Sequence, residues 1–330
     1  MKSITEKNPL VNVCCLTFNH AAFIGQAIES ILMQKTTFPF NIIVHDDASS
    51  DSTAIIIREY AEKHHDRIFP ILQKGNQYSK GVNLASKFVF PNCFGKYISF
   101  CEGDDFWTDP YKLQKQVEFL EANPDYGLVH GDVNHLDQKT GKIVEAFNKT
   151  NNIRIPSGDI FDFLMMPSHS VKTMTVCFRR DLFEKHYLQD TEIMSKDWRL
   201  LDISIWLALA RHSKIHYMDE VFATYRLLPE SMSRTKNPDK LHGFHQKIHE
   251  IRAYFAERYG ANDEIKTMLK ENYCRSNLVD AYNIGNKALS REAYSCLKQS
   301  GITISQREKI LYYATQYTWL HPIIDLFKSR

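Results

Sequence analysis

The 330-residue sequence lacks several features that would assign it to a common class of protein. No apolar run approaches the length of about 18 residues that a membrane-spanning helix needs. Neither the Walker sequence GxxxxGK followed by Ser or Thr nor the fingerprint GxGxxG occurs, which argues against an NTPase and a dinucleotide-binding enzyme. The seven cysteines include no CxxC pair. We therefore expect reduced thiols in place of disulfides or a zinc site.

The sequence also has no marked excess of charge of one sign. Its 41 Lys and Arg oppose 39 Asp and Glu, for a net charge of +2, which argues against a nucleic-acid partner. The balance is uneven, because residues 231–330 carry 16 basic and 10 acidic side chains (+6), which leaves 25 and 29 for residues 1–230 (−4). The N-terminal MKSITEKNPL has neither the basic region nor the long apolar region of a signal peptide. These features predict a cytoplasmic protein.

Strand-like and helix-like stretches alternate through the first 130 residues. Val11–Leu16 is an apolar run typical of a strand buried on both faces, and further strands are expected at 41–44, Ile68–Leu72, 96–100 and 126–130. Helical spacing of apolar residues marks 24–32, 54–61 and 113–120, with Asn19 or His20 expected to cap the first helix and Ser49, Ser50 or Asp51 the second. This alternation predicts an α/β fold with a doubly wound, mostly parallel sheet.

The pattern changes towards the C-terminus. Residues 140–195 show no clear period, residues 203–210 form a buried-looking helix, and beyond Asn237 apolar residues recur every three or four positions. We therefore expect two parts, an α/β domain over residues 1–235 and a helical region over residues 236–330. His245 and His249, spaced for metal binding on one helix, have no identified carboxylate partner and are expected on a solvated face.

Two acidic clusters directly follow predicted strands. Asp46 and Asp47 end the second run, and Glu102, Asp104 and Asp105 surround a glycine after the fourth. Open α/β sheets bind their ligands at the carboxyl ends of the strands. Crowded carboxylates repel one another unless a cation or proton intervenes, and Mg²⁺ needs few protein ligands when a diphosphate completes its shell. An acidic turn that only caps the next helix is the competing interpretation of each cluster.

Four segments resemble family 2 glycosyltransferases, bacterial inverting enzymes with the GT-A fold, a Rossmann-like α/β architecture. The resemblance spans residues 9–235 and rests on VNVCCLTFNHAAFIGQAIESILMQ, FNIIVHDDASSDST, GKYISFCEGDDFWTDPYKLQKQVEFLEANPDYGLVH and KIHYMDEVFATYRLLPESMS. It implies a hexosyltransferase-type reaction that moves a sugar from a nucleotide diphosphate sugar, with UDP favoured by family frequency, to the hydroxyl of a glycan or lipid-linked glycan. It also implies Mn²⁺ or Mg²⁺ as cofactor and a role in lipopolysaccharide or capsule assembly.

The resemblance also implies roles for individual residues. Asp47 matches the aspartate that contacts the nucleobase, and residues 102–105 fall on the DxD region, with Asp104 and then Asp105 as the metal ligands. The first acid is Glu102 where the family has Asp, and its longer arm argues against a direct metal bond. The expected nucleotide-sugar residues are Thr17, Asn19, Asp46, Asp47, Asn76, Lys80, Glu102, Gly103, Asp104 and Arg226.

A general base is expected further along the chain. An inverting transfer needs one carboxylate near the acceptor hydroxyl, and Asp202 resembles the family's aspartate in a D-x-x-L/I-W-L pattern. Asp197 is the alternative base, and helix capping is the competing interpretation of both. Arg226 is expected either to clamp the diphosphate or to form a structural salt bridge. The residues expected at the acceptor are His169, Thr173 and Trp206.

Two other functions compete with this prediction, and contact of the C-terminal segment with anionic lipid is compatible with it. Phosphoacceptor folds carry a nucleophilic Asp after an early strand, whereas here the first strand ends in Leu16-Thr17-Phe18-Asn19. A GT-A-like scaffold that binds glycans or nucleotides without turnover is the second alternative. Residues 317–330 combine apolar side chains with Lys328 and Arg330, which suits anionic lipid on the inner face of the cytoplasmic membrane. Packing on the first domain or on a second subunit is the competing explanation of these C-terminal helices.

Overall fold

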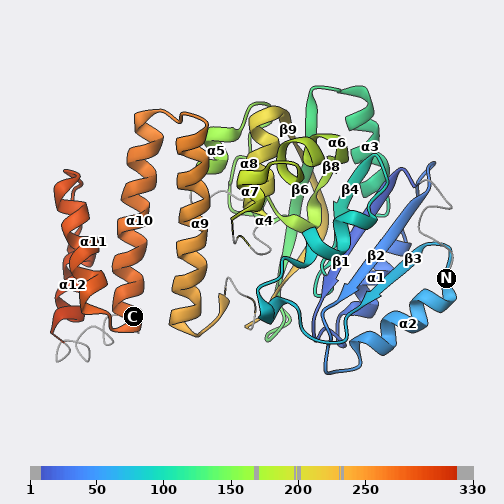
Figure 1. Cartoon of the computed structure of the whole chain (residues 1–330), viewed down its shortest axis with the longest axis horizontal. Helices are drawn as coiled ribbons and strands as arrows, with labels where there is room; N and C mark the ends of the chain where they lie inside the picture. The colour runs from blue at the N-terminus through green and yellow to red at the C-terminus, as the bar shows by residue number, and fades with distance from the viewer. Residues whose placement is uncertain are drawn as a thin grey trace. The chain divides into compact units, whose positions relative to one another are not determined.

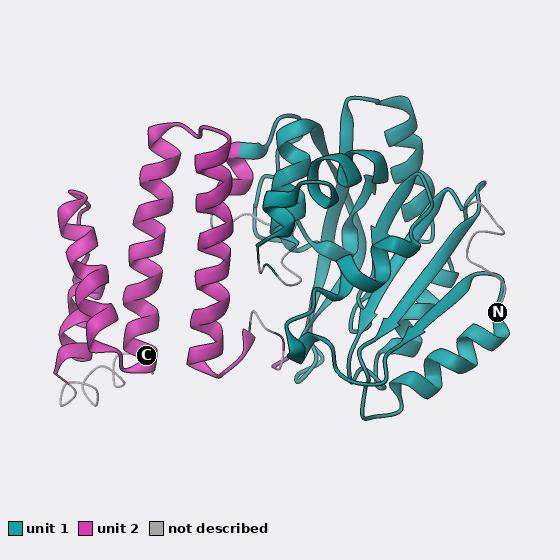
Figure 2. Ribbon diagram, in the orientation of Figure 1, with its two compact units in different colours: residues 1–161, 170–227 teal, residues 162–169, 228–330 magenta. Residues whose placement is uncertain are grey.

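The computed structural model describes residues 9–166, 171–196, 198, 202–229, 231 and 234–317. The chain divides into two compact units, Met1–Phe161 with Ser170–Leu227, and Asp162–His169 with Leu228–Arg330 (Figures 1 and 2). The main division therefore follows Leu227, earlier than the predicted boundary at residue 235. The second unit also takes in Asp162–His169, a segment that no pattern in the sequence had assigned.

The first unit is built on one nine-stranded sheet in the order β3-β2-β1-β4-β8-β6-β9-β5, with β7 paired to β6. Neighbours β3, β2, β1 and β4 are parallel, as are β6 and β9, whereas β8 is antiparallel to both β4 and β6. The predicted mostly parallel α/β sheet is confirmed, with one short antiparallel strand inserted at its centre. The strands are β1 (Val11–Thr17), β2 (Phe40–Asp46), β3 (Ile68–Leu72), β4 (Tyr97–Phe100), β5 (Phe106–Trp107), β6 (Tyr126–Asp137), β7 (Ile143–Val144), β8 (Cys177–Arg179) and β9 (Lys214–Leu227).

Helices cover this sheet through their apolar faces. Ile24, Ile28 and Ile31 of α1 are fully buried in the same core cluster as Val11 and Val13 of β1. The helices of the first unit are α1 (Ile24–Leu32), α2 (Thr53–Lys63), α3 (Lys112–Ala122), α4 (Phe147–Thr150), α6 (Arg180–Phe183), α7 (Thr191–Met194) and α8 (Ile203–His212); α5 (Phe161–Met165) begins at the boundary between the units.

The predicted helix caps are wrong in detail. Helix α1 begins at Ile24, four residues beyond His20, and helix α2 begins after Ser52; neither has a side-chain capping hydrogen bond at its N-cap. Asn19 is instead in the left-handed region, with φ of 56°, and its Oδ1 accepts a hydrogen bond from the Ser50 backbone N–H at 2.8 Å. These polar residues connect two loops to each other, and this use cannot be distinguished from capping in the sequence alone.

The second unit is helical, as predicted for the C-terminal region. Its helices are α9 (Pro238–Arg258), α10 (Asp263–Ile284), α11 (Lys287–Gln299) and α12 (Gln306–Gln316). Each of them follows directly after an Asn or Ser whose side chain caps the first turn. Within the described part of the chain, no helix is long and apolar enough to cross a membrane. The expected solvated face on α9 is in part wrong, because His242 and His245 both bind the buried carboxylate of Asp280 on α10.

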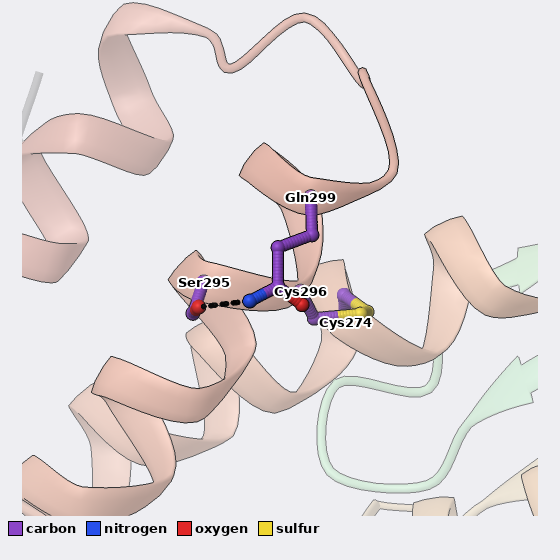
Figure 3. The surroundings of a disulfide bond; sticks show 4 residues. All are labelled: Cys274, Ser295, Cys296 and Gln299. Atoms are coloured by element: carbon purple, nitrogen blue, oxygen red, sulfur yellow. Dashed lines mark hydrogen bonds between the residues drawn. A yellow bond between two sulfur atoms is a disulfide. The ribbon is translucent and has the colours of Figure 1, made fainter.

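One prediction about cysteine is overturned in this unit. Cys274 of α10 and Cys296 of α11 form a disulfide, with their Cα atoms 6.2 Å apart (Figure 3). The packing of α10 on α11 brings together residues 22 positions apart, which spacing rules for cysteine do not anticipate. The other five cysteines are free and buried, as expected for them. The cysteines therefore no longer argue for a reducing compartment.

Candidate active site

The site lies where three parallel strands end side by side. Strand β1 pairs with β2 on one side, with Thr17 opposite Asp46, and with β4 on the other, with Cys14 opposite Phe100. The residues that follow these strands therefore leave the sheet at one edge. This arrangement brings both predicted acidic clusters next to the end of β1, the usual place for a ligand in such a sheet.

The loops after β1 and β2 are tied together by side-chain hydrogen bonds. The Asn19 N–H donates to Ser49 Oγ at 2.7 Å, the His20 N–H to Thr53 Oγ1 at 2.9 Å, and the Ala21 N–H to Asp51 Oδ2 at 3.0 Å. Asn19 and Ala48 both have positive φ values, 56° and 61°, which residues other than glycine seldom adopt. The contacts between the loops stabilise this backbone, so that the entrance to the site is built from two segments that support each other.

Asp46 and Asp47 have separate tasks in the loop after β2. Asp46 is 1% exposed, and its carboxylate accepts hydrogen bonds from the Ser49 N–H and hydroxyl. The Asp47 carboxylate, also 1% exposed, accepts the backbone N–H groups of Gln77 at 2.8 Å and Tyr78 at 3.0 Å. Asp47 therefore fixes the turn at η2 (Tyr78–Lys80) against the end of β2.

The other two residues predicted in this region also lie on that turn. The Asn76 amide donates to the Asp47 carbonyl at 3.4 Å, and its Oδ1 accepts the Ser79 N–H at 2.7 Å. Lys80 is exposed. Asp47 and Asn76 are therefore in contact, Lys80 ends the neighbouring turn, and their contact with a nucleotide stays a prediction. Sequence reasoning did not identify the backbone of Gln77 and Tyr78 as partners of Asp47, because a backbone donor leaves no signature in the sequence.

Gly103 packs against the end of β1 with no room for a side chain. A Cβ atom there would lie 2.6 Å from Thr17 Oγ1, 2.7 Å from Thr17 Cβ and 3.0 Å from His20 Nδ1. Thr17 Oγ1 and His20 Nδ1 are both buried and have no hydrogen-bond partner among the described residues. Buried polar atoms normally have partners, so these two atoms indicate a polar ligand at this point.

The acids that follow β4 repel one another in a poorly solvated place. Burial, together with the charges of Asp104 and Asp202, raises the pKa of Glu102 from 4.5 to about 8. Burial and the charges of Asp104 and Glu102 also raise the pKa of Asp105, whose Oδ1 accepts the Arg226 backbone N–H at 2.8 Å. Asp104 keeps 21% of its side chain exposed, whereas Asp105 is 1% exposed, and Asp104 Oδ2 lies 4.0 Å from His20 Nε2. The cluster therefore favours a proton or a cation near Glu102 and Asp104.

Arg226 is held between two aromatic rings. Its guanidinium carbon lies 4.9 Å from the centre of the Phe23 ring and 4.8 Å from that of Phe106, and its terminal nitrogens donate to Gln26 and Gln138. Burial lowers its pKa, against the charges of Asp105 and Asp104. No pattern in the sequence identified these two rings and two glutamines as neighbours of Arg226.

Asp202 joins this site from a distant part of the chain. It stands immediately before α8, where its side chain makes no capping hydrogen bond, and it instead accepts a hydrogen bond from Thr173 Oγ1. Burial raises the pKa of Asp202, while Thr173 and, after it, other neighbours including Lys172 lower it. The charge of Asp202 also contributes to the raised pKa of Glu102, although the two acids are 100 positions apart in the chain.

The remaining predicted residues are the alternative base and the three residues expected at the acceptor. Trp206 is 1% exposed and packs against Phe100 and Phe178, a placement that suits the core better than contact with an acceptor. His169 and Asp197 lie outside the described residues. Thr173 was expected at the acceptor, but its bond to Asp202 was not foreseen.

The metal prediction can be tested against the donor set. Over the described ranges, no three His, Cys, Asp or Glu side chains gather in a way that could hold an ion by themselves. Mn²⁺ and Mg²⁺ do not need such a group when phosphate oxygens and water supply the other ligands. Asp104 fits that requirement because it is accessible and carries excess negative charge around it. Asp105, 1% exposed and bound to a backbone N–H, fits it less well.

Comparison with known proteins identifies the family. The model of glycosyl transferase family 2 matches residues 13–186, more than half of the chain. The chain belongs to this family. The matched region of this family 2 member contains β1, β2, β4 and the acidic residues at their ends, whereas Asp202 and Arg226 lie beyond it.

Curated relatives are similar over different shares of the chain. An uncharacterised glycosyltransferase of Nostoc sp. is 28% identical over 226 residues, which cover 66% of this chain and 64% of that protein. The putative teichuronic acid biosynthesis glycosyltransferase TuaG of Bacillus subtilis is 27% identical over 240 residues, covering 71% of this chain and 85% of that protein. An uncharacterised protein of Mycobacterium bovis is 39% identical over 115 residues, or 35% of this chain, and the match spans about a third (32%) of its length.

Solved structures share the fold. The mannosyltransferase PcManGT from Pyrobaculum calidifontis, in complex with GDP-Man and Mn²⁺, aligns with a TM-score of 0.52 at 17% identity, over 96% of this chain and 82% of that chain. TarS of S. aureus, in complex with UDP-GlcNAc, aligns with a TM-score of 0.52 at 14% identity, over 89% and 93%. The predicted GT-A fold of this family 2 member is thereby confirmed.

Proposed function

We propose that this chain is an inverting glycosyltransferase that transfers a sugar from a nucleotide diphosphate sugar to an acceptor hydroxyl. The observation that carries the proposal is that Asp202 accepts a hydrogen bond from Thr173, close in the chain to Val176, whose carbonyl is bound by Ser99 of β4. These bonds connect a candidate base to a strand whose carboxyl end lies where donors bind. Membership in glycosyl transferase family 2 supports the same reaction class.

In the proposed reaction Asp202 is the general base. The acceptor hydroxyl loses its proton to the Asp202 carboxylate while its oxygen attacks C1 of the donor sugar. The bond from C1 to the diphosphate oxygen breaks in the same step, so that the configuration at C1 inverts. Burial raises the pKa of Asp202, which makes it a stronger base than an exposed aspartate, and the Thr173 hydroxyl holds one of its oxygens.

The donor is proposed to lie across the ends of β1, β2 and β4. In this arrangement Asn76 and Lys80 would face the nucleoside, beside the turn that the buried Asp47 carboxylate holds in place. Thr17, His20 and Gly103 would surround the phosphates, and Asp104 would hold Mn²⁺ or Mg²⁺. When bound, the ion would offset the charge of the departing diphosphate. Arg226, whose terminal nitrogens are bound to Gln26 and Gln138 and whose buried Nε has no partner among the described residues, is proposed to act through its positive charge.

The substrate class follows from relatives and is part of the proposal. PcManGT is in complex with GDP-Man and Mn²⁺, TarS with UDP or UDP-GlcNAc, and TuaG is named for teichuronic acid biosynthesis. A nucleotide sugar donor and a role in cell-surface polysaccharide assembly are therefore proposed for this chain. UDP remains our expected nucleotide, and thermal shift with UDP-, GDP- and dTDP-sugars plus Mn²⁺ would identify the donor through ligand stabilisation.

The decisive test of the mechanism is Asp202→Asn. This variant should retain binding of the stabilising nucleotide sugar and lose turnover by roughly a hundredfold or more, as removal of a general base does. Asp190→Asn is the matched control, because Asp190 also precedes a helix and caps α7 through the Glu192 and Ile193 N–H groups. Unchanged turnover in Asp202→Asn would move the role of base to Asp197. Nucleotide binding without turnover in the wild-type protein would favour the scaffold alternative.

We also propose that the helical unit docks on anionic lipid, near a lipid-linked acceptor. Helix α12 exposes Ile310 and Tyr313, 49% each, and Tyr317, 54%, beside the exposed cations Arg307 and Lys309. Aromatic and aliphatic side chains flanked by cations suit a negatively charged membrane surface. Phosphatidylglycerol vesicles should sediment the wild-type protein, and Ile310→Glu with Tyr313→Glu should abolish this. Dimerisation through the same face, with no sedimentation, would contradict the proposal.

A further inference from the structure

A lysine is buried beneath the active site. Lys112, the first residue of α3, is fully buried, and its Nζ donates to Ser99 Oγ at 2.9 Å, Gln116 Oε1 at 2.9 Å and the Val176 carbonyl at 3.2 Å. The same nitrogen lies 4.1 Å from the centre of the Trp107 ring. Burial lowers the pKa of Lys112 to about 7, against the charges of Cys177, Cys101 and Asp109. A buried ammonium group is costly, so its contacts require an explanation.

Those contacts converge on one short segment. Besides Lys112 and Ser99, which both bind the Val176 carbonyl, the Gln116 amide donates to the Thr175 carbonyl at 2.7 Å and the Trp107 indole N–H to the Met174 carbonyl at 2.8 Å. The carbonyls of three successive residues are therefore held from one side. We call the four side chains the carbonyl clamp: Ser99, Trp107, Lys112 and Gln116.

The segment held by the carbonyl clamp begins with the partner of Asp202. Thr173, Met174 and Thr175 form η5 (Thr173–Thr175), a single turn, and Thr173 Oγ1 donates to Asp202 Oδ2. One turn of helix is not stable on its own, so its position depends on tertiary contacts. The clamp supplies such contacts directly behind the hydroxyl that binds Asp202.

We propose that the carbonyl clamp, with Lys112 at its centre, is a positioning device that holds Thr173 so that its hydroxyl orients Asp202 for proton transfer. The clamp is part of the core, and Lys112 is a positioning residue rather than a catalytic one. The proposal rests on the role of Asp202 as general base, which is itself proposed above. Hydrogen bonding of Thr173 to the carboxylate form makes Asp202 easier to deprotonate, so loosening of η5 should raise the pKa of Asp202.

The test compares Lys112→Met with two other variants. Methionine retains the length of the side chain and removes its charge and donors. Gln116→Leu removes the hydrogen bond from the Gln116 amide to the Thr175 carbonyl and the bond that Lys112 donates to Gln116 Oε1. This variant takes the place of Lys112→Met in the test if Lys112→Met does not fold. Lys115→Met, on the same helix, removes an exposed lysine paired with Asp109 and Glu220 and is the matched control.

Two readouts do not require catalysis. Hydrogen exchange of the Thr175 and Val176 amides, which bond within η5, should accelerate at least tenfold in Lys112→Met while the amides of β1 and β2 stay protected. The pKa of Asp202, measured by ¹³C NMR of aspartate-labelled protein and assigned with Asp202→Asn, should rise as it does in Thr173→Val. The double variant should add little to Thr173→Val, because both changes break the same connection.

A third readout uses the reaction. The acid limb of the pH profile for hydrolysis of the stabilising nucleotide sugar should move to higher pH in Lys112→Met, with an unchanged KM for the donor, while Lys115→Met behaves as wild type. Unchanged exchange of η5 and an unchanged Asp202 pKa in both clamp variants would overturn the proposal. A wild-type protein that hydrolyses no nucleotide sugar would instead contradict the proposed function, and the exchange and NMR results would still decide whether the clamp positions Asp202.

Discussion

Replacement of Glu102 by Gln should change the pH dependence of stability. Glu102 lies in an acidic cluster after β4, where burial and the charges of Asp104 and Asp202 raise its pKa from 4.5 to about 8. The folded protein therefore keeps this proton to higher pH than the unfolded chain does. Between pH 4.5 and pH 8 the folded state binds more protons, so the free energy of unfolding falls as the pH rises.

The magnitude follows from the width of that window. One proton bound only by the folded state changes the free energy of unfolding by about 1.36 kcal/mol for each pH unit. Over the window from 4.5 to about 8, the loss is on the order of 5 kcal/mol for Glu102. This is comparable with the whole stability of a small domain, about 5–15 kcal/mol. Glutamine does not titrate, so the free energy of unfolding of Glu102→Gln should increase relative to that of the wild type as the pH rises.

Urea unfolding at half-unit steps from pH 5 to pH 8, with EDTA present to remove divalent ions, measures this difference. Glu118→Gln, a change at an exposed residue of α3, controls for the loss of one negative charge. The expected result is a gap between Glu102→Gln and wild type that widens with pH, and no such widening for Glu118→Gln. A constant gap across the range would refute the assignment of a raised pKa to Glu102.

Three further predictions concern other contacts. Gly103→Ala would place a Cβ 2.6 Å from Thr17 Oγ1, and this overpacking should cost about 1–3 kcal/mol in urea unfolding and weaken nucleotide-sugar binding. Asp47→Ala leaves two backbone N–H groups without their acceptor and should destabilise the first unit by about 1.5–3 kcal/mol, with loss of thermal stabilisation by nucleotide. Changing Cys274 and Cys296 together to Ala opens a loop of 22 positions and should cost the helical unit about 3 kcal/mol, measured by calorimetry.

Matched variants control for these changes. Gly243→Ala, in α9 with no atom near the added Cβ, should not destabilise the protein, unlike Gly103→Ala. Asp190→Ala removes a carboxylate that binds the Glu192 and Ile193 N–H groups before α7, and should leave nucleotide binding intact. Dithiothreitol should lower the melting temperature of the wild type but not of the double cysteine variant. Equal behaviour of a variant and its control would contradict the corresponding prediction.

The parallel half of the sheet could be predicted because β1 and β2 are buried on both faces and largely apolar, with Asn12 and Asn41 as exceptions before their polar ends. Strand β3 is half-buried and apolar throughout, and the intervening helices repeat their apolar residues with helical spacing. The ends of these strands then identified the acidic clusters. Residues 140–195 could not be assigned, because β8 has three residues and η5 has three, too few for any period to appear.

The site could be predicted only where a residue type implied its role. Asp47, Glu102 and Asp104 follow strands and Asp202 precedes a helix, and the roles given to them stay predictions. Partners that act through the backbone, such as the N–H groups of Gln77 and Tyr78, are invisible in a sequence. No pattern in the sequence singled out Lys112, because its burial depends on a segment more than 60 residues away.

That separation has a consequence for synthesis of the chain. Strand β4 is bordered on one side by β1, made early, and on the other by β8, which the ribosome adds some 75 residues later. Until then β4 is an unpaired edge, open to pairing with another nascent chain, and Lys112 lacks the carbonyl of Val176. A pause in translation between residues 125 and 175 should therefore be a vulnerable period for aggregation. The segment proposed to orient Asp202 directly precedes β8, the strand that joins β4 to β6.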